Sequence, residues 1–60
     1  MITKKDVGYG WNTEANDVVT VYVIYEGQTL KSLFNCKDVT SLRKRLLIRS
    51  SIDKLIDKLN

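Results

Sequence analysis

The 60-residue sequence has no histidine, no proline and a single cysteine, Cys36, and these absences exclude several chemistries. Without histidine there is no Ser-His-Asp or Cys-His catalytic pair and no imidazole metal ligand. One cysteine excludes an internal disulfide and a cysteine-rich zinc site, and it favours a reducing compartment. Asp53 and Asp57, the one helical carboxylate pair, alternate with Lys54 and Lys58 as surface ion pairs do. We therefore expect a protein that is not an enzyme, with no cofactor, no metal and no small-molecule substrate.

Long apolar runs are also missing. The longest run, Val18 to Tyr25, covers eight residues, which is too short to cross a bilayer. The segment after Met1 does not resemble a signal peptide, so the sequence predicts no membrane partner and a cytoplasmic location. Residues 1–60 form one small domain, and a chain this short buries only about 60% of its unfolded surface. Such a fold is marginal alone, or it gains stability from a ligand, a partner or self-association.

Three segments are predicted strands: residues 7–11, 18–25 and 28–34. The second is the strongest, because β-branched and aromatic residues fill it. If Glu26-Gly27 is a two-residue hairpin turn, Val23 lies opposite Leu30. The same pairing puts further apolar residues on one face, with Val21 opposite Ser32 and Val19 opposite Phe34. We assign that face to the core, because a slip of one residue would mix the two faces.

The pairing of the first strand depends on the connection formed by residues 12–17. If all six are loop, Trp11 lies opposite Val18, and the glycines of the first strand face the core. The other sheet face then carries an apolar patch that we predict to be an interaction surface: Tyr9, Trp11, Tyr22, Ile24 and Leu33. Exposed apolar patches of this kind usually mark binding sites. The alternative is a different loop, in which the aromatic residues fill the core and the patch shrinks.

From residue 39 the pattern is helical. Leu42 and Leu46 share one face, but the apolar face that includes Ile52 is rotated well away from it. Ser50 and Asp53 resemble a capping box, so two short helices, about 39–48 and 51–59, are favoured over one curved helix. Asp38 or Thr40 can cap the first turn. The predicted fold class is α+β, a three-stranded antiparallel sheet with one face covered by a C-terminal helix or pair of short helices.

The positive charge is concentrated in one stretch. The whole chain has a net charge of +3, yet residues 31–49 contain six basic residues against Asp38 alone. We predict that this stretch binds nucleic acid, because a single-sign stretch attracts a polyanion and arginine grips two phosphate oxygens at once. The candidate residues are Lys31, Lys37, Arg43, Lys44, Arg45 and Arg49. A solvated helix face is the alternative explanation of these charges.

The order of three antiparallel strands and a helix resembles the small DNA-binding domains at the N-termini of phage-type integrases. The segment Tyr22-Val23-Ile24-Tyr25-Glu26-Gly27-Gln28, followed by the basic stretch, carries the resemblance, which covers architecture only. It implies a small nucleic-acid-binding module or regulator. The second hypothesis is a protein-binding inhibitor or adaptor of the phage or plasmid accessory type, which binds a host protein or forms a homodimer through its apolar sheet face.

Overall fold

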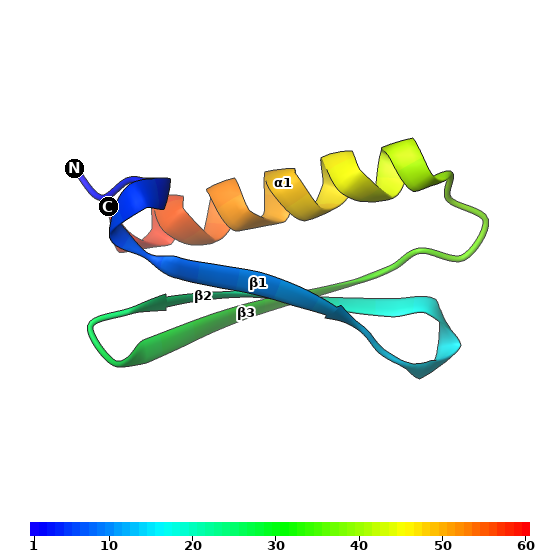
Figure 1. Cartoon of the computed structure of the whole chain (residues 1–60), viewed down its shortest axis with the longest axis horizontal. Coiled ribbons are helices and arrows are strands. Elements are labelled where there is room, and N and C mark those ends of the chain that lie inside the picture. The colour runs from blue at the N-terminus through cyan, green and yellow to red at the C-terminus, as the bar shows by residue number, and fades with distance from the viewer.

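Three antiparallel strands form one sheet, and a single helix lies across one of its faces in the computed structural model, which describes residues 1–60 (Figure 1). The strands are β1 (Gly8–Thr13), β2 (Val18–Tyr25) and β3 (Gln28–Asn35), in the spatial order β1-β2-β3. The helix α1 spans Ser41–Leu59. Short 3-10 turns precede β1 (η1, Lys4–Asp6) and β2 (η2, Ala15–Asp17). This arrangement confirms the predicted α+β fold.

The hairpin between β2 and β3 has the predicted register, with Val23 opposite Leu30. Glu26 and Gly27 form its turn, and their φ angles are 49° and 79°. Two positive φ angles are typical of the type I′ turn, whose twist matches that of the flanking strands. The face assigned to the core is correct, because its three valines have no exposed surface: Val19, Val21 and Val23.

The predicted register of β1 is wrong. Trp11 pairs with Val21 rather than Val18, and this shift of three residues moves every β1 side chain to the opposite face. The cause is the connection: the strand continues to Thr13, and η2 turns the chain within the residues that follow. Asn16 and Asp17 there have φ angles of 64° and 61°. Asn and Asp tolerate this left-handed conformation better than other side chains, which permits the tighter turn.

The new register places Gly10 beside Tyr22 on the outer face of the sheet, the face opposite α1. A Cβ atom added to Gly10 would lie 2.5 Å from Tyr22 Oη and 2.8 Å from Tyr22 Cζ. The ring of Tyr22 therefore lies over the space that the glycine leaves empty. Aromatic side chains cover edge-strand glycines in this way and help to fix strand register.

The C-terminal segment is one continuous helix, so the preference for two helices is wrong. Thr40 caps it, since its hydroxyl accepts a hydrogen bond from the backbone N–H of Arg43 at 3.2 Å. No glycine or proline interrupts residues 41–59. The apparent break came from treating Leu42 and Leu46 as an apolar face equivalent to the one that includes Ile52. Both are exposed, Leu42 by 69%, so their different angular position requires no second helix.

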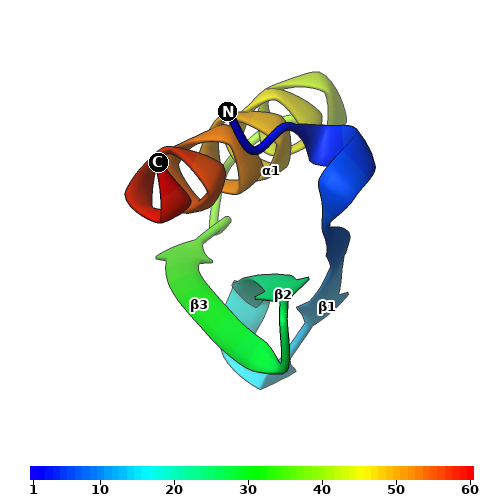
Figure 2. The ribbon, with the colours of Figure 1, turned by 90° about the vertical axis from the view of Figure 1, so that its left-hand side faces the viewer.

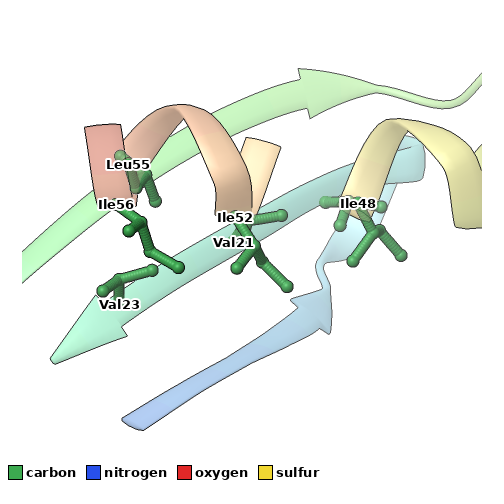
Figure 3. Close-up of a cluster of buried hydrophobic side chains, with 7 residues drawn as sticks. Val21, Val23, Ile48, Ile52, Leu55 and Ile56 are labelled. Carbon is green, nitrogen blue, oxygen red and sulfur yellow. The ribbon is translucent and has the colours of Figure 1, made fainter. Parts of the chain in front are cut away.

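The core is a seam between β2 and the C-terminal two thirds of α1 (Figure 3). Helical residues spaced three and four apart supply one side of it: Ile48, Ile52, Leu55 and Ile56. Partly buried side chains pack around the seam, and Cys36 is one of them. Cys36 is therefore a small side chain that packs beside the core.

We predict that the register of β1 can be tested through Gly10. Gly10→Ala should destabilise the fold by about 0.5–1.5 kcal/mol, because the new methyl group pushes the Tyr22 ring off its rotamer. In a Tyr22→Ala background the same change should be neutral or stabilising. Gly8→Ala is the control, since its Cβ would meet Ile24 Cβ at an ordinary 3.8 Å. Equal effects of Gly10→Ala in both backgrounds, measured by urea denaturation, would contradict this register.

We expect Ile52, which is 2% exposed, to be the most sensitive position of the seam. Ile52→Val should cost about 0.5–1.5 kcal/mol of unfolding free energy and Ile52→Ala about 2–5 kcal/mol. The second value is a large part of the total expected for 60 residues, at about 0.05–0.15 kcal/mol per residue. Leu42→Ala, on the exposed side, should change stability by less than about 0.5 kcal/mol. Thermal denaturation followed by circular dichroism would rank the stability of the three variants.

Candidate functional site

A pocket of about 310 Å³ opens between β1 and α1. Its lining combines three kinds of side chain. Two aromatic residues of β1, two buried aliphatic residues of α1 and three basic residues line it: Tyr9 and Trp11, then Ile48 and Ile52, then Lys4, Arg45 and Arg49. No acidic residue lines it. The pocket therefore offers apolar flat surfaces beside positive charge.

The pocket exists because α1 covers only part of the sheet. The helix packs against β2 and β3, and β1 stands at the edge beyond it (Figure 2). Tyr9 and Trp11 point to the helix side of β1, where the helix does not reach far enough to bury them. They remain 44% and 49% exposed. Ile48 and Ile52 are buried, so they form a rigid base under these half-exposed rings.

Lys4 reaches the pocket because the N-terminal segment is fixed at both ends. Its turn, η1, is closed by Asp6, whose carboxylate accepts hydrogen bonds from the backbone N–H and the hydroxyl of Thr3. Further back, the side chain of Asn60 joins the two termini: its Oδ1 accepts from the N–H of Ile2 at 2.7 Å, and its Nδ2 donates to the Ile2 carbonyl at 3.0 Å. The ammonium of Lys4 lies 5.1 Å from the centre of the Tyr9 ring, a cation–π contact.

Arg45 and Arg49 lie one turn apart on α1, and both are exposed. Neither guanidinium forms an ion pair within 4.0 Å or a side-chain hydrogen bond inside the chain. Residues 41–52 of the helix contain no acidic side chain, and its first turn has none. The helix N-terminus carries partial positive charge that falls off within the first turn, so it disfavours Arg43 and Lys44 but does not reach Arg49. Arg45 and Arg49 are like charges four residues apart on the helix, and a bound anion would relieve their repulsion.

The other predicted basic residues do not join the pocket. Arg43 is about 160° away from Arg45 around the helix, at 3.6 residues per turn. The ammonium of Lys44 donates a 3.1 Å hydrogen bond to Thr13 Oγ1 at the end of β1. Lys31 pairs with Tyr22 on the outer sheet face, and Lys37 lies in the connection between β3 and α1. The six candidates are therefore spread over several surfaces, and only Arg45 and Arg49 line the pocket.

The predicted apolar interaction surface is also divided. Tyr22, Ile24 and Leu33 lie on the outer face, but the register places Tyr9 and Trp11 on the helix side. The five residues do not form one patch. On the outer face Leu33 is 65% exposed, while Tyr22 is partly covered by its contact with β1.

Lys4 is the pocket residue that the sequence did not indicate. It lies in the half of the chain where acidic residues outnumber basic ones, and 41 positions separate it from Arg45. No local pattern connects the two. The aliphatic base was visible in the helical spacing of Ile48 and Ile52, but only as core.

No protein-family model matches the chain, and no curated protein or solved structure matches it either. No helix in the structure combines the length and apolar character needed to span a membrane. No group of three or more His, Cys, Asp or Glu side chains comes together. Any function proposed for the chain therefore has to be inferred from the residues of the pocket.

We predict that the field around Trp11 is positive, and the fluorescence of this single tryptophan can measure it. Iodide should quench Trp11 more efficiently than caesium, because Lys4, Arg45 and Arg49 concentrate anions at the pocket. The difference should shrink as salt is raised past 0.1 M, where the screening length is about 10 Å. Equal quenching by the two ions at low salt would contradict the positive field.

Proposed function

We propose that this protein is a small non-catalytic nucleic-acid-binding module or regulator. It holds phosphates with the basic residues around the pocket, Arg45, Arg49 and Lys4. The observation that carries the proposal is the convergence of three cations, from two distant parts of the chain, on a pocket without any carboxylate. A reducing cytoplasm is the compartment most compatible with the free thiol Cys36.

Phosphate suits these residues for two physical reasons. The planar guanidinium of arginine can donate two parallel hydrogen bonds to phosphate oxygens, and both arginines are free to do so. In addition, an anion beside Arg45 and Arg49 compensates the repulsion between these two like charges, which lie four residues apart on α1. The exposed rings of β1 add a surface that can contact nucleobases.

The second candidate function is protein binding or homodimer formation through the outer sheet face. Leu33 and Ile24 are exposed there, beside Tyr22. This candidate has less support than it had from the sequence, because the two largest exposed aromatic residues, Tyr9 and Trp11, belong to the opposite face.

We expect binding to depend on salt in proportion to the phosphates contacted. Three contacts predict a slope of log affinity against log salt of about −2.7 on duplex DNA and about −2.1 on a single strand. The double change Arg45→Gln and Arg49→Gln should flatten these slopes by about 1.8 and about 1.4. Fluorescence anisotropy with labelled oligonucleotides, titrated at several salt concentrations, measures both quantities.

The matched control is the double change Lys54→Gln and Lys58→Gln. It also removes two positive charges, but from the other half of α1, where Asp53 and Asp57 are neighbours. The slope should stay nearly the same in this control. If both double variants lose affinity equally, net charge alone drives binding and the pocket is not the site. No binding to either oligonucleotide at low salt would reject the nucleic-acid function and leave protein binding as the better hypothesis.

A further inference from the structure

The two aromatic residues of the pocket are not equivalent. The ammonium of Lys4 lies 5.1 Å from the centre of the Tyr9 ring, so this ring is already in contact with a cation of the same chain. Trp11 has no cation–π partner and is 49% exposed. Of the two rings, the indole of Trp11 is thus the one available to a ligand. It offers the largest flat apolar surface of any side chain.

The surroundings of Trp11 restrict what the ligand can be. Ile48 and Ile52 form an apolar base that a polar group could not contact without losing its hydrogen bonds to water. Arg45, Arg49 and Lys4 surround the same space, so the ligand must also be anionic close to its apolar part. A flat apolar group attached to phosphates meets both requirements. A nucleotide within a strand is such a group, and its volume suits a pocket at the lower end of the usual ligand range, about 300–1,000 Å³.

Resting on the proposed function, we infer that the pocket takes one unstacked nucleobase on the indole of Trp11, with the flanking phosphates at Arg45, Arg49 and Lys4. In a duplex the faces of the bases are stacked on one another and closed to a side chain. The module therefore prefers single-stranded nucleic acid. Every base has a π-face, so this site selects for strand state rather than for sequence.

The test compares three DNA probes of equal length: a single strand carrying bases, a single strand of abasic residues with the same phosphates, and a duplex. The base-bearing strand should bind roughly 5- to 150-fold more tightly than the abasic strand, the factor for one stacked base. It should also quench the emission of Trp11, while the abasic strand leaves that emission nearly unchanged. These comparisons use the unaltered protein and do not depend on the folding of a variant.

Two variants locate the effect. Trp11→Leu keeps an apolar side chain in β1 and should lower the affinity for the base-bearing strand to that of the abasic one. Trp11→Phe keeps an aromatic face and should retain most of the difference. Tyr25→Leu is the control, because it removes a ring that neither lines the pocket nor pairs with β1 and should leave the ratio unchanged.

The outcomes separate the inference from the function on which it rests. Equal, salt-dependent binding of the base-bearing and abasic strands, with unchanged Trp11 emission, would overturn the base pocket and leave phosphate binding intact. A loss of the ratio in Tyr25→Leu but not in Trp11→Leu would place base contact outside the pocket and also overturn it. If no probe binds at low salt, both the function and the inference fail, and a protein partner becomes the remaining hypothesis.

Discussion

The contact between the valines of β2 and the aliphatic face of α1 is the interaction on which the rest of the structure depends. Val21 and Ile52 lie at the middle of this seam, and neither is more than 2% exposed. These seam residues belong to the core cluster that holds all the buried residues of the chain, so the helix lies where this contact is best. The helix packs against both β2 and β3, and β1 lies at the edge of the sheet that the helix does not cover (Figure 2).

That uneven covering creates the candidate site. A helix centred on the sheet would bury the aromatic residues of β1. Because α1 is displaced toward β3, Tyr9 and Trp11 stay half-exposed beside the buried Ile48 and Ile52. The same position of the helix brings Arg45 and Arg49 to the edge of this space. The hydrogen bonds between Asn60 and the backbone of Ile2 hold the N-terminal segment against the C-terminus, and this segment brings Lys4 to the pocket.

The charges of α1 depart from the usual arrangement of a helix. Basic side chains normally favour the C-terminal turn and acidic ones the N-terminal turn, yet Arg43, Lys44 and Arg45 occupy the first turns and no acid accompanies them. Departures from such local rules tend to concentrate at functional sites, where something other than the isolated fold compensates them. Lys44 is partly compensated by Thr13, whereas Arg45 and Arg49 have no partner in the chain.

The sequence by itself determined the α+β class, the bounds of β2, the turn at Glu26-Gly27 and the register of β2 with β3. These follow from local spacing, because a two-residue turn fixes the pairing directly and alternation defines the buried face. The register of β1 was decided only in the tertiary structure, since the left-handed residues of η2 set how many residues the connection uses. The continuity of α1 was decided there too, because only the packed sheet shows that Leu42 need not be buried. The candidate site was likewise only partly predictable. The sequence identified the basic helix and the aromatic residues, but as separate features. Bringing Lys4, Trp11 and Arg45 to one pocket required contacts between parts of the chain that no local pattern connects.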